Sequence, residues 1–309
     1  MPCIRKFGWN ASGVWASAHR MSTPDIVFIG FGEAGRAFSG QLSCQARGYD
    51  RKLDAAQTAD AKRHDFDSNG VEAAETNALA VAGARLIVSL VTADQAIAAA
   101  EETARSIAPG ALFCDLNSVA PGSKRTAAKA IEAAGGRYVD VAVMSPVYPK
   151  QLQAPLLVSG PHAEDGAAAL KALGFNPRVV GNAVGDASSI KMLRSVMVKG
   201  IEALSAECAL AAHAAGVEKE VIASLDASWP GADWSKRFDY NLDRMLIHGL
   251  RRAAEMEEVV KTLDGLDTGS QMSRGTVQRQ RAIGNLAAGA PDGLAAKVDL
   301  ILKRKAQAA

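Results

Sequence analysis

The chain has 309 residues, enough for one large or two ordinary domains, and carries a formal net charge of +2 with 22% charged residues. This balance gives no strong field to attract nucleic acid or a membrane surface. No apolar run approaches the ~20 residues that a spanning helix needs. The four cysteines are scattered and form no C-x-x-C or His/Cys cluster. We therefore expect a cytoplasmic protein with reduced thiols and no structural metal site.

The first 24 residues differ from the rest of the chain. They contain Arg5, Lys6 and Arg20 but no acidic residue, and they lack the solid apolar segment of a secretory signal. We expect residues 1–24 to be a disordered extension. Met21 stands shortly before the first predicted strand and would make a natural start.

A glycine pattern near residue 30 organises the following domain. The apolar run 26–29 predicts a strand buried on both faces, and the residues from Glu33 to about Cys44 favour a helix. The glycines between them have the spacing G-x-G-x-x-G, which in this context predicts a dinucleotide-binding turn. A glycine turn made only for packing is the alternative. The expected cofactor contacts are Gly30, Phe31, Gly32, Glu33, Ala34 and Gly35.

Asp50 bears on which dinucleotide binds. It lies 20 residues after Gly30, the spacing at which a carboxylate reaches the adenosine ribose hydroxyls. A carboxylate there favours NAD, because it would repel a 2′-phosphate. NADP stays open, because a 2′-phosphate could be held by nearby cations: Arg51, Lys52, Lys62 and Arg63.

Strands and helices alternate as far as residue 180. Strong buried strands are predicted at 86–91, 111–115 and 138–143, and shorter ones at 156–159 and 178–180. This alternation predicts an α/β fold with a Rossmann-type, doubly wound, mostly parallel sheet.

Polar residues follow two of these strands, where ligands of open α/β sheets bind. Val91 and Thr92 stand at the end of strand 86–91, and we expect them to contact the cofactor. Asn117 and Ser118 follow strand 111–115, which makes them candidates for contact with the substrate or the nicotinamide. The alternative for this second pair is turn and N-cap chemistry before a helix that we expect to begin near Ser123.

The pattern changes after Gly185. Residues 186–215 predict one long helix, and helical signals dominate to the end of the chain. We therefore expect a dinucleotide-binding domain at 25–185 and an all-α substrate or oligomerisation domain at 186–309. The long helix carries an apolar stripe at steps of three and four: Ile190, Leu193, Met197, Ile201, Leu204 and Cys208. A polar ridge runs beside it: Lys191, Ser195, Lys199 and Glu202.

Lys191 is the candidate acid/base on this ridge. It stands in the first turns of the helix, near the expected domain cleft. Burial would lower its pKa, and it could then take the proton of a substrate hydroxyl. Arg194 could pair with a substrate carboxylate, which suits its planar fork. The alternative for Lys191 is a solvated lysine on an amphipathic helix.

Three segments together resemble the β-hydroxyacid dehydrogenase superfamily, which includes 3-hydroxyisobutyrate, tartronate semialdehyde and 6-phosphogluconate dehydrogenases. They are residues 30–35, 115–121 and 185–195, in this order. The segments 143–147, 191–200 and 248–256 look like a phosphogluconate-dehydrogenase-like branch with its own type of C-terminal domain.

The resemblance implies a Rossmann-type domain, a helical C-terminal domain and a catalytic lysine at Lys191. It also implies that Asn117 and Ser118 stand where the family has a Ser-Thr pair near the substrate. Two departures indicate a larger or differently placed substrate. Ser195 replaces the family's asparagine, and residues 140–146 replace its glycine-containing carboxylate loop. Ser145 in this loop is a further substrate candidate.

We therefore expect an oxidoreductase that uses NAD or NADP and acts on a small hydroxy acid or related alcohol. Lys191 would be the general acid/base, and Asn117, Ser118 and Ser195 would orient the substrate. Charge for an acidic group on the substrate could come from Arg194, Lys199, His248 and Arg251. The alternatives are an imine reductase and a non-catalytic cofactor-binding scaffold. Alanine-rich helices and the family resemblance lead us to expect a homo-oligomer, such as a homodimer.

Overall fold

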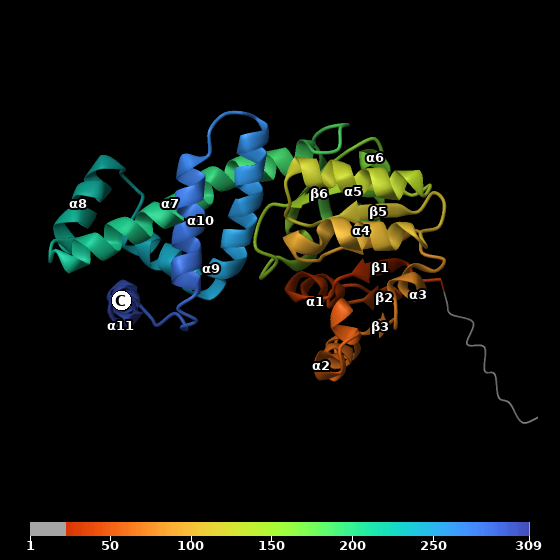
Figure 1. The fold of residues 1–309 in the computed structure, drawn as a ribbon, viewed down its shortest axis with the longest axis horizontal. Coiled ribbons are helices and arrows are strands. Elements are labelled where there is room, and N and C mark those ends of the chain that lie inside the picture. Colours follow the sequence, from red (N-terminus) through yellow and green to blue (C-terminus); the bar gives the residue numbers. More distant parts are fainter. Residues whose placement is uncertain (1–22, 309) are drawn as a thin grey trace, which may run out of the picture.

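The computed structural model describes residues 23–308, with the side chains of 305–308 left out. The prediction for the N-terminal extension therefore falls almost entirely outside the described residues. The chain forms two lobes, a sheet with flanking helices and a group of helices, and the long helix α7 runs from one to the other (Figure 1). None of the described helices is long and apolar enough to cross a membrane.

The first lobe is built on one sheet, whose order in the described chain is β3-β2-β1-β4-β5-β6-β7-β8. Neighbouring strands are parallel except β6 and β7, which are antiparallel. This confirms the predicted doubly wound, mostly parallel fold. The strands are β1 (Ile26–Ile29), β2 (Ala46–Tyr49), β3 (Val71–Ala73), β4 (Leu86–Ser89), β5 (Leu112–Asp115), β6 (Arg137–Val143), β7 (Pro155–Ser159) and β8 (Asn176–Val179).

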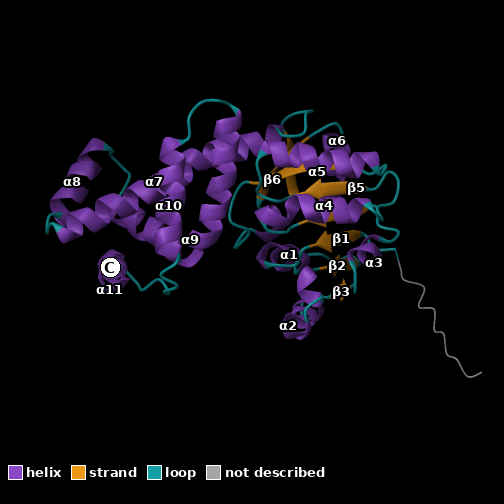
Figure 2. Cartoon of the chain, in the orientation of Figure 1, coloured by secondary structure: helices purple, strands orange, loops and turns teal. Residues whose placement is uncertain are grey.

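Helices cover both faces of this sheet, which is why β1, β4 and β5 consist of buried residues throughout (Figure 2). The α-helices of this lobe are α1 (Glu33–Ser39), α2 (Ala56–Asp67), α3 (Asn77–Val81), α4 (Ala96–Ala104), α5 (Pro121–Ala133) and α6 (Ala163–Ala172). Short 3-10 helices are η1 (Arg51–Leu53), η2 (Ala93–Gln95) and η3 (Gln151–Gln153).

Two boundaries differ from the sequence prediction. The helix after the glycine pattern was expected to reach about residue 44, but α1 ends at Ser39 and Gly40 follows as its C-cap. The helix expected near residue 123 starts at Pro121, because proline suits the first position of a helix, where no N–H is needed.

The second lobe is helical. Its helices are α7 (Asp186–Ala214), α8 (Glu218–Ser228), α9 (Trp234–Gly265), α10 (Gln271–Gly284) and α11 (Leu294–Ala308). The helices α9 and α10 cross closely at two glycines. A Cβ atom on Gly249 would lie 2.6 Å from the carbonyl oxygen of Gln280, and one on Gly284 would lie 2.5 Å from the backbone nitrogen of Leu250.

Two buried side chains of the sheet hold the start of α7. The carboxylate Oδ2 of Asp140 accepts hydrogen bonds of 3.1 Å from the backbone N–H groups of Gly185 and Ser188. Ser159 Oγ accepts another, of 2.9 Å, from Ala187. These bonds satisfy N–H groups that the first turn of a helix leaves without internal partners. The sheet thereby fixes the turn that precedes Lys191.

An amphipathic helix usually buries its apolar face and exposes its polar face, and α7 does the reverse. Members of its apolar stripe are exposed: Ile190 by 42%, Leu193 by 44%, Met197 by 64% and Leu204 by 56%. On the polar ridge, Ser195, Lys199 and Glu202 are buried against the helical lobe. The ridge is satisfied there by partners on other helices. Arg252 Nε donates to Glu202 Oε2 over 2.8 Å, and Gln280 Nε2 donates to the same oxygen over 2.9 Å.

Candidate active site

The three glycines after β1 have different surroundings. Gly30 has φ +85°, and a Cβ atom there would lie 2.7 Å from the carbonyl oxygen of Leu90. At Gly35 a Cβ would lie 2.8 Å from the Phe31 ring, so close packing requires glycine. At Gly32 no atom of the described chain lies within 4 Å of that position. The first glycine makes the turn, the third packs, and the second leaves an open face, as a bound pyrophosphate requires.

Asp50 is fixed beside this loop at the end of β2. Its Oδ2 accepts a 2.8 Å hydrogen bond from the Phe31 N–H, and its Oδ1 accepts one of 3.0 Å from the Lys52 N–H. Val91 and Thr92 follow β4 on the other side. Val91 Cγ1 lies 2.9 Å from the position of a Cβ on Gly30, so this segment contacts the glycine turn.

The cations considered for a 2′-phosphate differ in availability. Lys62 is buried, donates to the carbonyl oxygen of Phe31 over 2.8 Å, and forms a 2.6 Å ion pair with Asp65. Arg63 pairs with acidic side chains at 3.5 and 3.3 Å. Arg51 donates to the Gln95 side chain. Lys62 therefore supports the loop from below, and Arg51 and Lys52 are the exposed cations next to Asp50.

Asn117, Ser118 and Lys191 meet at the C-terminal edge of the sheet. The Lys191 ammonium donates a hydrogen bond to Ser118 Oγ. The side-chain amide of Asn117 donates to Ser89 Oγ over 2.9 Å. Its carbonyl oxygen, Oδ1, is buried with no hydrogen-bond partner among the described residues. A ligand bound at this edge of the sheet would lie near the buried acceptor of Asn117. It would also lie near the Ser118 hydroxyl, to which Lys191 donates.

Burial lowers the pKa of Lys191 to about 8, because protein atoms surround the ammonium although part of the side chain stays accessible. The charge of Glu255 opposes this shift, and the charges of Lys199, Lys124 and Arg251 add to it. Lys191 can therefore lose and regain a proton near neutral pH, which an exposed lysine does not do.

A fully buried lysine supports the floor of the site. Lys124 Nζ lies 3.0 Å from Asp115 Oδ1 and 3.3 Å from Asp140 Oδ1. Tyr138 OH donates to Asp115 Oδ2 over 2.7 Å. This set joins the end of β5, which leads into Asn117 and Ser118, to the aspartate that holds α7. Nothing in the local sequence predicts this buried position, because a lysine in an amphipathic helix is ordinarily exposed.

Three side chains on one face of α9 hold neighbouring elements: two contact the sheet lobe and one contacts α7. Arg251 Nη1 lies 2.7 Å from Glu33 Oε2 in the glycine loop. Glu255 Oε2 lies 2.8 Å from Lys199 Nζ, and Glu258 Oε2 accepts a 2.8 Å hydrogen bond from the Ala120 N–H. The last bond holds the loop that carries Asn117 and Ser118. Sequence reasoning missed Glu255 and Glu258, because only the packing of α9 reveals their partners.

Other predicted site residues lie elsewhere or are engaged. Ser195 Oγ donates to the Lys191 carbonyl oxygen over 2.9 Å and accepts from Lys199 Nζ at 3.4 Å, so it sits between the two lysines. Arg194 is exposed on α7. Ser145 donates to the carbonyl oxygen of Pro146 over 3.0 Å. His248 is half-buried on α9, and burial, with Arg244 and Arg251, lowers its pKa.

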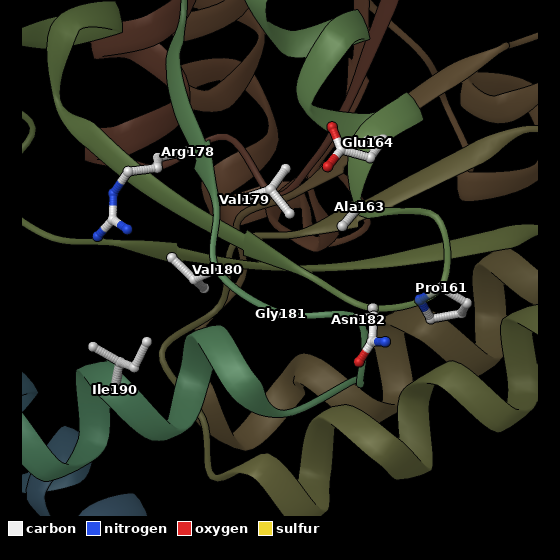
Figure 3. Close-up of a pocket in the computed structure, with 10 residues that line it drawn as sticks. Pro161, Ala163, Glu164, Arg178, Val179, Val180, Gly181, Asn182 and Ile190 are labelled. Carbon is white, nitrogen blue, oxygen red and sulfur yellow. The ribbon is translucent and has the colours of Figure 1, made fainter.

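A cavity of about 620 Å³ opens beside β8 and the start of α6, away from these residues (Figure 3). Arg178, Glu164 and Asn182 line it, together with Ile190 of α7. None of the predicted catalytic or cofactor residues lines it. In the described part of the chain, no group of three or more His, Cys, Asp or Glu side chains could hold a metal ion.

Comparison with known proteins gives two family matches. Residues 25–173 match the NAD binding domain of 6-phosphogluconate dehydrogenase, and residues 212–283 match a domain of unknown function, DUF1932. An uncharacterised 28.5 kDa protein of Methanothermus fervidus is 27% identical over 179 residues, which span 57% of this chain and 66% of that protein.

Solved structures extend the likeness to nearly the whole chain. A conserved hypothetical protein from Sinorhizobium meliloti 1021 is 36% identical over 90% of this chain and 96% of that chain, with a TM-score of 0.72. The 3-hydroxyisobutyrate dehydrogenase of Mycobacterium tuberculosis, solved with L-serine, is 16% identical (90% and 99% covered, TM-score 0.69). An imine reductase from Myxococcus stipitatus in complex with NADP+ is 19% identical (90% and 100% covered, TM-score 0.53). At this level of identity, the last two proteins are similar to this chain in fold.

Proposed function

Because the chain belongs to the β-hydroxyacid dehydrogenase superfamily, we propose that it is an oxidoreductase that uses NAD or NADP and acts on a small hydroxy acid or a related alcohol or carbonyl compound. One observation carries the proposal. A lysine with a lowered pKa donates to Ser118 at the edge of the sheet where the open glycine turn also lies. That combination joins an acid/base to a cofactor site.

The residues divide the work as follows. A bound nicotinamide dinucleotide would supply the acceptor or donor of the hydride. The loop from Gly30 to Gly35 would hold its pyrophosphate, and Asp50 its adenosine ribose. Asn117 and Ser118 would orient the substrate. Lys191, when neutral, would take the proton of the substrate hydroxyl during oxidation and return it during reduction.

We favour NAD slightly over NADP. Two backbone N–H groups hold the Asp50 carboxylate, so its negative charge cannot easily turn away from a 2′-phosphate. Lys62 already donates a hydrogen bond to the carbonyl oxygen of Phe31 in the glycine loop. Binding of NADP would depend on Arg51 and Lys52.

The substrate in this proposal carries an acidic or polar group. Arg251 and Lys199 already have acidic partners, whereas Arg194 is exposed and His248 is half-buried. A substrate carboxylate near Lys191 would therefore compete with Glu33 for Arg251, or with Glu255 for Lys199.

A panel of hydroxy acids with NAD and NADP, followed by the absorbance of the reduced cofactor, tests the function. We expect Lys191→Ala to lower turnover about 10²- to 10⁴-fold on the substrate found, the range for loss of a general acid/base. Full turnover by a folded Lys191→Ala variant would show that the assigned role is wrong. Activity on cyclic imines and none on alcohols would favour an imine reductase. Tight cofactor binding without turnover on any compound would favour a scaffold.

We also propose that the protein is a homo-oligomer that buries the apolar face of α7. Met197 and Leu204 project from this face into solvent. They line a cavity of about 620 Å³ between α7 and α10, to which Met272, 72% exposed, also contributes. Contiguous apolar surface of this kind is typical of a protein interface.

A further inference from the structure

Helix α9 places one carboxylate among the cations that surround Lys191. Glu255 Oε2 lies 2.8 Å from Lys199 Nζ, and its Oε1 lies 4.0 Å from Arg251 Nε. Lys199 Nζ in turn lies 3.4 Å from Ser195 Oγ, which donates to the Lys191 carbonyl oxygen. Glu255 thus sits between helix α7, with its two lysines, and the arginine that reaches the glycine loop.

The charged groups that act on Lys191 come from three helices. Lys124 of α5, Lys199 of α7 and Arg251 of α9 carry positive charge, and Glu255 of α9 carries the opposing negative charge. Burial alone would raise the pKa of Glu255. The charges of Lys199 and Lys191 outweigh that effect and lower the pKa to about 2, so Glu255 stays ionised throughout the physiological range.

We propose that Glu255 is a positioning residue for the reaction: its carboxylate neutralises the cations around Lys191 and so sets how much of Lys191 is protonated at neutral pH. The proposal rests on the proposed role of Lys191 as acid/base. Glu255 need not touch the substrate. It acts through the charge of Lys191, and its ion pair with Lys199 keeps it in place.

The direction of the effect follows from the charges. Removing the Glu255 charge leaves Lys191 among uncompensated cations, which disfavours its ammonium form and lowers its pKa. A shift of about one unit is at the lower end for a nearby opposite charge. From a pKa of about 8, such a shift would raise the neutral fraction of Lys191 at pH 7 about fivefold.

The test is competitive labelling of the intact protein with acetic anhydride across pH 6 to 10, with peptide mass spectrometry to follow Lys191. This measures the pKa of Lys191 without any substrate. For Glu255→Gln we expect labelling of Lys191 at pH 7 to rise about fivefold, whereas Glu255→Asp should stay near the wild type. Glu257→Gln is the matched control, because Glu257 lies on the same helix but pairs with Arg281 at 2.5 Å.

A second variant covers the case in which Glu255→Gln does not fold. Lys199→Met removes a positive charge that lowers the pKa of Lys191, so labelling of Lys191 at pH 7 should fall. An unchanged labelling curve of Lys191 in a folded Glu255→Gln variant overturns the inference, as does an unchanged curve in Lys199→Met.

The acid/base role is tested separately. On an active substrate, the acidic limb of the pH profile of kcat/KM for oxidation should move down by about one unit in Glu255→Gln. If labelling shifts as expected but Lys191→Ala keeps full turnover, the proposed function fails and the charge relation between Glu255 and Lys191 stands.

Discussion

At the scale of single residues, the two lysines of α7 show how surroundings decide what a side chain can do. Lys191 and Lys199 are two helical turns apart on one ridge. Lys199 is buried with the carboxylate of Glu255, whereas Lys191 donates to the neutral hydroxyl of Ser118. Burial lowers the pKa of Lys191, and a neutral hydroxyl does not oppose that effect as a paired carboxylate would, so Lys191 can exchange a proton near neutral pH.

The pH dependence of the proposed reaction follows from this pKa of about 8. Oxidation needs neutral Lys191, so kcat/KM should rise about tenfold from pH 7 to pH 9 and then level off. Reduction needs the ammonium form and should fall over the same interval. Initial rates in both directions, at matched ionic strength, check the signs. An oxidation rate that falls with pH in this range would contradict a general-base role for Lys191.

Residue identity alone could not reveal the supporting charges of the site. The positions of Lys191, Asn117 and Ser118 at the edge of the sheet could be predicted, because each follows a strand or opens a helix in a recognisable pattern. Lys124 and Glu255 were not. A buried lysine needs carboxylates that come from distant strands, here Asp115 and Asp140, and no local spacing announces them.

At the scale of elements, the crossing of α9 and α10 depends on having no side chain at the contact. Gly249 and Gly284 face each other's backbone, and a Cβ atom on either would approach backbone atoms to 2.6 Å or less. Backbone atoms yield less readily than the end of a flexible side chain. The two glycines therefore determine how closely α9, which carries Arg251, Glu255 and Glu258, packs against α10.

Gly249→Ala should destabilise the protein by about 1–3 kcal/mol, the usual cost of overpacking a close contact. The matched control is Gly265→Ala in the last turn of α9, where no described atom lies within 4 Å of the added Cβ. That change should be neutral or stabilise by up to about 1 kcal/mol, because alanine favours helix. Urea denaturation of both variants decides it. Equal midpoints for the two would show that the crossing tolerates a side chain.

The elements differ in how far sequence could predict them. The apolar runs of β1, β4 and β5 were visible because strands buried on both faces are apolar throughout. The three-residue strand β3 was missed, since Val71–Ala73 is too short to show a period. The long helix was predicted at residues 186–215, and α7 spans 186–214. Which of its faces is covered depends on α9, and the polar ridge is the covered one.

At the scale of the whole molecule, the apolar face of α7 stays exposed to solvent in a single copy of the chain. Exposed apolar residues recur along it at helical steps, and burying them in a partner would recover free energy at roughly 25 cal/mol for each Å². The same helix holds Lys191 on its other side. An interface formed by this face would therefore lie on the side of α7 that faces away from Lys191.

Leu204→Glu should shift the protein toward monomers, because the charge would be placed in the apolar interface. Light scattering after size-exclusion chromatography, at several protein concentrations, measures the mass. Glu220→Lys on α8 serves as a charge-changing control outside this face, and its mass should equal that of the unchanged protein. A monomer at all concentrations before any substitution would contradict the proposed homo-oligomer.

The hydrogen bonds from the first turn of α7 to Asp140 and Ser159 attach that end of the helix to the sheet. Displacement about a pivot grows with distance from it. At 1.5 Å per residue, Lys191 lies only ~7 Å from Asp186, whereas the far end of α7 lies ~40 Å away. A rocking of the helical lobe by about 10° would move the far end by ~7 Å and Lys191 by only ~1 Å. A rotation of α7 about its anchored end would therefore displace the Lys191 amine far less than the far end of the helix.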